Sequence, residues 1–294
     1  MTLALGSDAT DTLSLDAFVA HLEHDLGVRD QTDLVRAAPA FKCLLNNDRL
    51  LADFIAAELT GWRNGRSDHE YVGHTLVLAR RPAFMVRANV WVAPDPRKPA
   101  PTAQDPGFGY LTPHDHNFAF LTGAYHGPGY ETVLFEYDPD AVVGVPGEKV
   151  ELRPCGRRAF PRGAMMLYEA SRDVHYQEHP AALSITLNVV VTGRYTERAQ
   201  FLFDVPSGTI AAALTPASTR GTTLCELAAA VGDGDTAELL LDVARQAENP
   251  RVRIAAAQAL RVLQPTDGAA LVAELRADRD YCVRGLAALA GSDG

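Results

Sequence analysis

Histidines gather in one part of this sequence. Five of the nine histidines lie between positions 114 and 179, in the runs HDH (114–116) and HYQEH (175–179) with His126 between them. Side chains of a β-strand alternate between its two faces, so His114 and His116 are expected on one face and Asp115 on the other. A third imidazole from a neighbouring strand, such as His175, could complete part of a coordination sphere. Since neutral imidazole is the commonest protein metal ligand, this spacing predicts a metal site.

Three further side chains compete for a place in that site. His126 and Glu131 flank a Gly-Pro-Gly turn, and Glu131 could supply a carboxylate if the strand after the turn folds back on the histidines. His179 precedes Pro180, which favours a turn over a helix, so the spacing of His175 and His179 does not indicate a helical zinc motif. Imidazole ligands accept iron, zinc, manganese and nickel, so the residue types alone leave the metal open.

Other polar side chains in the same region are candidates for substrate contacts. Arg87 lies between apolar neighbours in an expected strand, where an outward-facing arginine is the favoured interpretation. The alternative is an inward-facing guanidinium, which would suit a substrate carboxylate. Asp173, two residues before His175, is a candidate to accept a hydrogen bond from its ring. One of several tyrosines could bring a hydroxyl to the metal, with core packing as the alternative role. These tyrosines are Tyr125, Tyr130, Tyr168, Tyr176 and Tyr195.

The elements that must position these residues follow from two changes in composition. Apolar residues at helical spacing predict helices between 14 and 65, the second of them over 41–62. Short β-branched or alternating runs separated by Pro- and Gly-rich breaks predict an antiparallel sandwich or barrel. These runs are 74–78, 84–92, 118–121, 132–137, 150–154, 164–168 and 183–191. After Asp204 an Ala- and Leu-rich composition predicts helices. We therefore expect three domains: 1–70, 71–205 and 206–294.

The C-terminal region contains two similar segments. NPRVRIAAAQAL (249–260) and DRDYCVRGLAAL (278–289) each carry a Val-Arg pair, and the pairs are separated by 31 residues. An acidic or Asn-Pro turn followed by Val-Arg, small residues and leucine resembles the HEAT-like helical repeat. Such repeats stack and bury a shared face. The resemblance implies an appended helical stack that serves packing, homodimerisation or docking of a protein partner.

Charge and cysteine content exclude several classes of function. The formal net charge is −10, and no stretch forms a basic stripe, so neither nucleic acid nor an anionic membrane is an expected partner. The four cysteines are far apart, which is typical of reduced structural thiols. The N-terminus shows no signal-peptide pattern, and no apolar run reaches the roughly 18 residues of a membrane helix. A soluble, cytoplasmic protein is expected.

The strand region resembles the cupin superfamily, a small antiparallel barrel with a metal in its mouth. His114 and His116 match the His-x-His of the first cupin motif, while Phe120 or Leu121 stands where the family usually has glutamate. The second motif begins at Gly163, and its histidine corresponds to His175, one residue later than usual. His179 takes the place of the terminal asparagine of that motif, and the Pro-x-Gly turn within it is missing.

Cupins that lack the glutamate include the three-histidine thiol dioxygenases, of the cysteine dioxygenase type. This resemblance implies a mononuclear non-heme Fe(II) oxygenase in which His114, His116 and His175 hold the metal. The substrates would be O2 and a small polar molecule (amino-acid-like, thiol or carboxylate) that binds the metal. It also makes Tyr176, Arg87 and His179 the candidate catalytic residues.

Two other kinds of function fit the same sequence. A zinc, manganese or nickel cupin could act as an isomerase, hydrolase or decarboxylase without O2. A non-catalytic module could bind a ligand in the β-domain and a protein through the helical repeats.

Overall fold

The structure is a computed structural model of the 294-residue chain, and it describes residues 2–64, 71–72, 74–94, 97, 110–192, 199–214 and 220–290. Two compact units make up the chain. The first contains Met1–Tyr137 and Leu152–Thr196, and the second contains Asp138–Glu151 and Glu197–Gly294. The predicted helical and strand regions up to residue 137 thus fall in one unit, whereas residues 138–151 belong to the other.

The N-terminal helices begin and end at residues that satisfy their backbone groups. They are α1 (Leu15–Ala20), the π-helical turn η1 (His21–Leu26), α2 (Gln31–Leu45) and α3 (Leu50–Arg63). Ser14 caps α1 and Asp30 caps α2, each accepting hydrogen bonds from backbone N–H groups of the first turn. The prediction of a single helix over 41–62 is wrong, because α2 ends at Leu45 and α3 begins only at Leu50. The side-chain amides of Asn46 and Asn47 donate there to carbonyls of the segment before α1, which fixes the turn.

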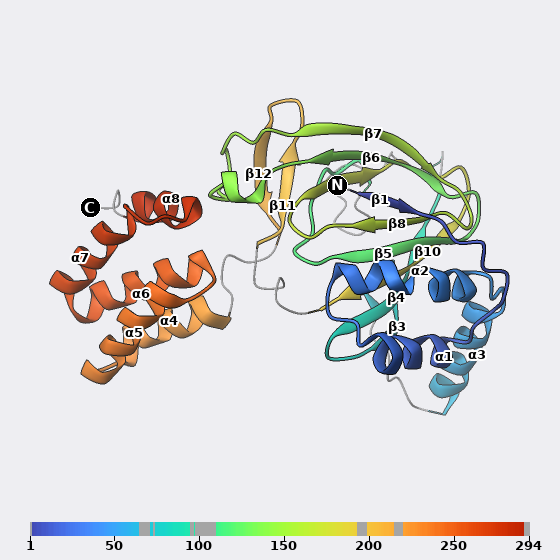
Figure 1. Cartoon of the computed structure of the whole chain (residues 1–294), viewed down its shortest axis with the longest axis horizontal. Coiled ribbons are helices and arrows are strands. Elements are labelled where there is room, and N and C mark those ends of the chain that lie inside the picture. The colour runs from blue at the N-terminus through green and yellow to red at the C-terminus, as the bar shows by residue number, and fades with distance from the viewer. Residues whose placement is uncertain are drawn as a thin grey trace. The chain divides into compact units, whose positions relative to one another are not determined.

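A seven-stranded antiparallel sheet forms the centre of the first unit (Figure 1). Its order is β1-β8-β5-β10-β4-β3-β2. The bounds are β1 (Leu3–Leu5), β2 (Tyr71–Val72), β3 (Thr75–Arg80), β4 (Phe84–Trp91), β5 (Phe120–His126), β8 (Met165–Tyr168) and β10 (Ser184–Val191). Because β10 pairs with β4 on one side and β5 on the other, strands from three distant parts of the sequence form its middle.

A separate three-stranded sheet has the order β7-β6-β9, with β6 (Tyr130–Glu136), β7 (Arg153–Phe160) and β9 (Asp173–Gln177). The chain crosses from one sheet to the other at Gly127 and Gly129, whose positive φ and close approach to the carbonyls of Leu183 and Phe160 leave no room for a side chain. Consequently β5 and β6 do not pair with each other. Among the described residues the strands form open sheets, and the expected closed cupin-type barrel is not found.

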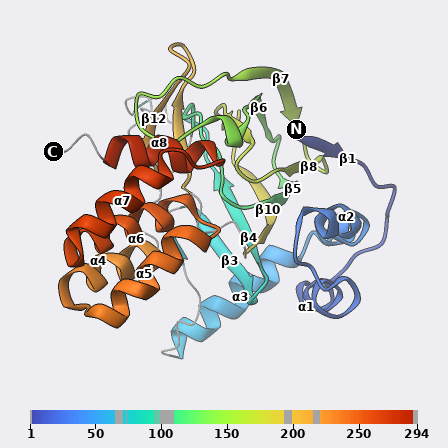
Figure 2. The ribbon, with the colours of Figure 1, turned by 60° about the vertical axis from the view of Figure 1, so that its left-hand side comes forward.

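The two faces of the large sheet have different surroundings. On one face α2 packs against β5, β8 and β10, and the helical layer lies on this side (Figures 1 and 2). Phe41 and Leu45 of α2 come so close to β5 that a Cβ at position 123 would force these side chains to shift. The opposite face contributes Trp91, Phe120 and Tyr168 to a second, largely aromatic cluster.

The described residues of the second unit form a β-hairpin, five α-helices and one short 3-10 helix. The hairpin consists of β11 (Phe201–Asp204) and β12 (Thr209–Ala213). The prediction of a helix directly after Asp204 is therefore wrong, because a strand follows there. The helices are α4 (Arg220–Val231), α5 (Gly234–Gln246), α6 (Pro250–Leu263), α7 (Pro265–Leu275) and α8 (Tyr281–Ala290). Helix α6 contacts each of the other four helices (Figure 2). The helical character is confirmed, but a HEAT-like repeat is not.

A short 3-10 helix, η2 (Pro139–Ala141), lies in the 138–151 segment of the same unit. No helix in the described parts of the chain is long and apolar enough to cross a membrane.

Candidate metal centre

The His-x-His segment lies beside β9 and is held there by a single bridge rather than by a regular strand. The backbone of His114 and that of His175 exchange two N–H···O hydrogen bonds of 3.1 and 2.9 Å. Asp115 turns to the opposite side, is fully buried and accepts a 2.7 Å hydrogen bond from the Tyr137 hydroxyl. The predicted alternation therefore holds, although the segment is not part of a named strand.

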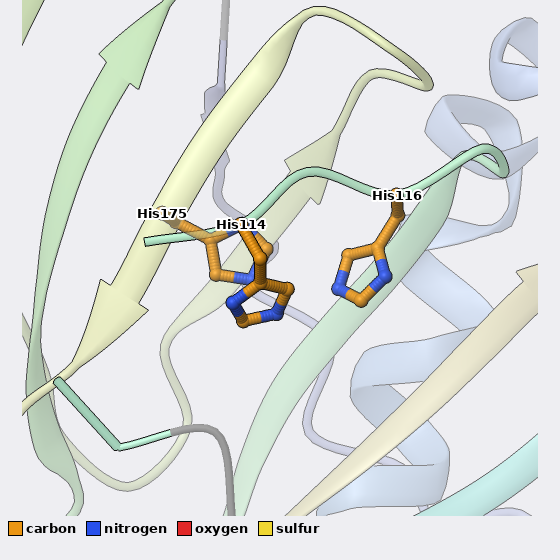
Figure 3. A group of neighbouring side chains, drawn as sticks. All are labelled: His114, His116 and His175. Carbon is orange, nitrogen blue, oxygen red and sulfur yellow. The ribbon is translucent and has the colours of Figure 1, made fainter. Parts of the chain in front are cut away.

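The three imidazoles His114, His116 and His175 come together (Figure 3). Their ring centroids are 4.9 Å apart for His114 and His116, 4.6 Å for His114 and His175, and 5.1 Å for His116 and His175. One nitrogen from each ring lies within 4.8 Å of the others. No other group of three or more His, Cys, Asp and Glu ligand atoms this close occurs in the part of the chain that the structure describes.

Burial favours the neutral form of these rings. Desolvation lowers the pKa of His114, and it lowers the pKa of His116 and of His175 well below the usual value. A neutral imidazole has a free lone pair, which is the form that binds a metal. His114 Nδ1 lies 2.7 Å from the Thr112 carbonyl oxygen and donates to it, which leaves Nε2 as the ring nitrogen with a lone pair for a metal.

Two of the rings have an unsatisfied nitrogen. His116 Nδ1 and His175 Nδ1 are buried and have no hydrogen-bond partner among the described residues. Buried nitrogens of this kind normally have a partner. Three clustered neutral imidazoles, two with unpaired nitrogens, are a donor set that fits a transition metal ion.

The three histidines line a cavity of about 210 Å³ in the first unit. The cavity also receives side chains from the inner faces of both sheets. Arg87 and Asn89 come from β4, Asn188 from β10, and Gln177 from β9. None of the described residues that line it is an aspartate or a glutamate.

Arg87 is the cationic group of the cavity. Its guanidinium carbon lies 5.7 Å from the centre of the Phe118 ring, and its Nε has no hydrogen-bond partner among the described residues. Burial lowers the pKa of Arg87 to about 10, so the side chain keeps its positive charge at neutral pH. Arg87 therefore faces the cavity, which is the alternative orientation and not the outward one that the sequence favoured.

Aromatic rings form the apolar part of the wall. Phe120 and Tyr168 stack with centroids 4.6 Å apart, and the Tyr168 ring lies 4.4 Å from that of His175. Trp91 and Tyr130 form a second pair at 5.0 Å. Burial raises the pKa of Tyr130 and of Tyr168, so both hydroxyls stay protonated.

Five other sequence candidates lie away from this cavity, among them Tyr125, whose hydroxyl donates to the Asn47 carbonyl. Tyr176 points to the other face of β9 and stacks on Phe135. The ring of His179 packs against Tyr110 at 4.3 Å and does not line the cavity. Glu131 is paired with Arg157 at the surface, and His126 is exposed at the end of β5. Tyr195 lies outside the described residues.

Asp173 also has a defined place: it is buried, and its carboxylate accepts from the backbone N–H of Glu169. The structure thus brings the three histidines and Arg87 together without Tyr176 or His179.

Sequence reasoning missed several polar residues of the cavity wall. Asn188, Thr122, Gln177 and Asn89 all line it, as does His74, whose orientation the sequence left open. A signal exists: in the strands 84–91 and 184–191, Arg87, Asn89 and Asn188 interrupt runs that are otherwise mostly apolar. Arg87 and Asn89 are two positions apart and so share one face of their strand. Polar residues on one face of a buried strand indicate that this face lines a site.

Comparisons with known proteins give only weak similarities. No protein-family model and no curated protein sequence matches the chain. Among solved structures, a hydroquinone 1,2-dioxygenase from Sphingomonas sp. TTNP3 with 4-hydroxybenzoate bound is 14% identical, with a TM-score of 0.28, over 43% of this chain and 70% of that one. The hydroxypropylphosphonic acid epoxidase from S. wedmorenis is 13% identical, with a TM-score of 0.23, over 40% of this chain and 50% of that one. A structure reported for the DMSP lyases RdDddP and RnDddQII is 11% identical, with a TM-score of 0.26, over 68% and 84%. Similarities this weak decide neither fold nor activity.

Proposed function

We propose that this chain is a metal-dependent enzyme of the mononuclear non-heme Fe(II) oxygenase kind. His114, His116 and His175 would hold the metal, and the substrates would be O2 and a small polar molecule. The observation that carries this proposal is the approach of three neutral imidazoles in the wall of a cavity. The relationship to three-histidine cupins is part of the proposal, supported by the His-x-His segment bridged to the histidine of a facing strand.

Each part of the cavity has a role in this proposal. A bound ferrous ion would supply the redox chemistry by which O2 oxidises an organic molecule. Three imidazoles add no negative charge, so the ion's charge would favour an anionic substrate. Arg87 adds a second positive charge to the same wall. The aromatic side chains make part of the wall apolar, and a lower local dielectric would strengthen these electrostatic interactions.

The first test is metal content, measured by elemental mass spectrometry on protein purified without a metal-chelating tag. We expect about one iron per chain in the native protein, because the three imidazoles form one metal site. His116→Ala should lose that iron. His179→Ala is the matched control, because His179 belongs to the same histidine-rich region but does not line the cavity. It should retain the metal.

The same samples distinguish the other functions. Iron accompanied by O2 uptake with a substrate supports the oxygenase. Zinc, manganese or nickel without O2 uptake would replace it by Lewis-acid chemistry on the same ligands. Absence of metal after anaerobic Fe(II) reconstitution would overturn the proposal and leave a ligand-binding module.

A further inference from the structure

Two buried hydrogen-bond donors of the cavity wall lack an acceptor. Arg87 on β4 and Asn188 on β10 are cross-strand partners, so their side chains lie on the same face of the large sheet. Arg87 Nε and Asn188 Nδ2 are both buried without a hydrogen-bond partner among the described residues. Asn188 is only 2% exposed. A buried donor without a partner is costly, so a ligand that supplies acceptor oxygens at this rung would be stabilised.

The charges around the cavity restrict what else this ligand can carry. Arg87 is positive, and no carboxylate is present among the described lining residues. An ammonium group in the cavity would therefore lack a counter-ion beside a guanidinium, and burying an unpaired charge is strongly unfavourable. A carboxylate is favoured at the same place, since it can accept from a guanidinium and an amide together.

The remaining wall sets the size and polarity of the rest of the ligand. Trp91, Phe120, Tyr130 and Tyr168 form an apolar surface on which a planar group can stack. The volume of about 210 Å³ is below the range of about 300–1,000 Å³ typical of drug-sized ligands. A cavity of about 150 Å³ is enough for benzene, so a single ring with one acidic group fits.

We propose that the cavity takes a small carboxylate with a planar apolar body and no amino group, and that Arg87 and Asn188 receive its carboxylate. Arg87 was a candidate from the sequence, whereas Asn188 enters only through its position beside it. That this molecule is the substrate rests on the proposed function. The binding itself does not.

The test is a titration with benzoate, followed by the fluorescence of Trp91. The chain has two tryptophans, and Trp62 is 53% exposed whereas Trp91 lies in the cavity wall. Trp62→Phe therefore leaves one reporter at the site and serves as the background for all measurements. We expect saturable quenching by benzoate, and binding of benzamide at least tenfold weaker, because the amide lacks the charge. Phenylacetate should bind at least tenfold more tightly than phenylglycine, which adds only an amino group.

Variants assign the two donors. Arg87→Met should weaken benzoate binding tenfold or more and Asn188→Ala severalfold, while Arg81→Met, an exposed arginine paired with Glu23, should leave it unchanged. If Arg87→Met does not fold, Asn188→Ala and the two ligand comparisons on the background protein decide. Equal binding of benzoate and benzamide, or of phenylacetate and phenylglycine, would overturn the proposal. So would binding that survives Arg87→Met but disappears in His116→Ala, because the carboxylate would then depend on the metal.

Metal content measured in the same samples separates the two proposals. Iron binding without benzoate binding overturns this inference and leaves the proposed function standing. Benzoate binding that depends on Arg87 in a protein that takes up no metal supports this inference and overturns the proposed function.

Discussion

Asp115 lies between the two histidines of the HDH segment, and its side chain holds the segment in place from the opposite side. Its buried carboxylate accepts a 2.7 Å hydrogen bond from the Tyr137 hydroxyl. Tyr137→Phe leaves this buried acceptor without that donor, which costs about 1–3 kcal/mol. We expect the free energy of unfolding to fall by that amount in urea denaturation, with weaker retention of the metal. Tyr176→Phe is the control, because Tyr176 stacks on Phe135 on the other face of β9. A change in Tyr137→Phe no larger than in the control would contradict the anchoring role.

His74 makes the stability of the first unit sensitive to acid. Burial, with a smaller contribution from the charge of Arg87, lowers the pKa of His74 from 6.5 to about 4. Between these two pH values the unfolded chain takes up a proton that the folded chain does not. The stability from this group is therefore present above about pH 6.5 and is lost as pH falls toward 4.

The acid sensitivity can be measured on metal-free protein by urea denaturation at pH 7, 6 and 5. Each unmatched proton contributes a slope of up to about 1.4 kcal/mol per pH unit. In His74→Gln the slope of the unfolding free energy against pH should be shallower by up to this amount. Part of the slope should remain, because the three clustered histidines contribute to it as well. Identical slopes in the two proteins would show that His74 does not titrate in this way.

At this scale the sequence predicts the clustered histidines better than the residues around them. His114, His116 and His175 could be identified because few residue types bind metals and their spacing fits alternating strands. Asn188 could not, because a single asparagine in an apolar strand is informative only when its neighbour is known. That neighbour, Arg87, is about a hundred residues away, and only the register of β10 on β4 brings them together.

At the scale of elements, the contact of α2 with β5 depends on a glycine. A Cβ at Gly123 would lie 2.5 Å from a methyl carbon of Leu45 and 2.7 Å from a ring carbon of Phe41. Gly123→Ala should therefore lower the free energy of unfolding by about 1–3 kcal/mol through overpacking. Gly6→Ala is the matched control, because nothing lies within 4 Å of a Cβ there. Equal stability of the two variants would mean that the helix can move away without cost.

Element types followed from local patterns, but their pairing did not. The first helix and the central strands were predictable because helical spacing and apolar alternation are local signals, whereas the sequence left the cap open between Ser14 and Asp16. Alternating strands with Pro–Gly breaks fit a barrel and a pair of sheets equally well. The crossing of the chain at 127–129 produces two sheets instead of a barrel. Before the crossing, β5 pairs with β8 and β10; after it, β6 pairs with β7 and β9. Those partners lie far away in the sequence.

At the scale of the whole molecule, the second unit is built from two separate parts of the chain. Residues 138–151 contact the C-terminal region of the chain within this unit. The Gly144 carbonyl accepts from the Arg251 guanidinium, and the Cys282 thiol lies 3.4 Å from the Val143 carbonyl oxygen. Within the segment itself, the Glu148 carboxylate accepts from the backbone N–H groups of 143–145. Nothing local in the sequence marks this 14-residue segment as part of the C-terminal unit, since its partners follow more than 50 residues later.

This interruption predicts how the first unit can be isolated. A chain cut after Thr196 would keep residues 138–151 but lose their partners, exposing the buried side chains of Val142 and Val150, and we expect it to aggregate. Glu136 of β6 and Arg153 of β7 are cross-strand partners, so an Asn-Gly turn between Tyr137 and Leu152 can close the hairpin. The same truncated chain with Asn-Gly in place of residues 138–151 should stay monomeric in size-exclusion chromatography, unfold cooperatively, and take up as much metal per chain as the full-length protein. If it aggregates as the simple truncation does, the first unit needs the second in order to fold.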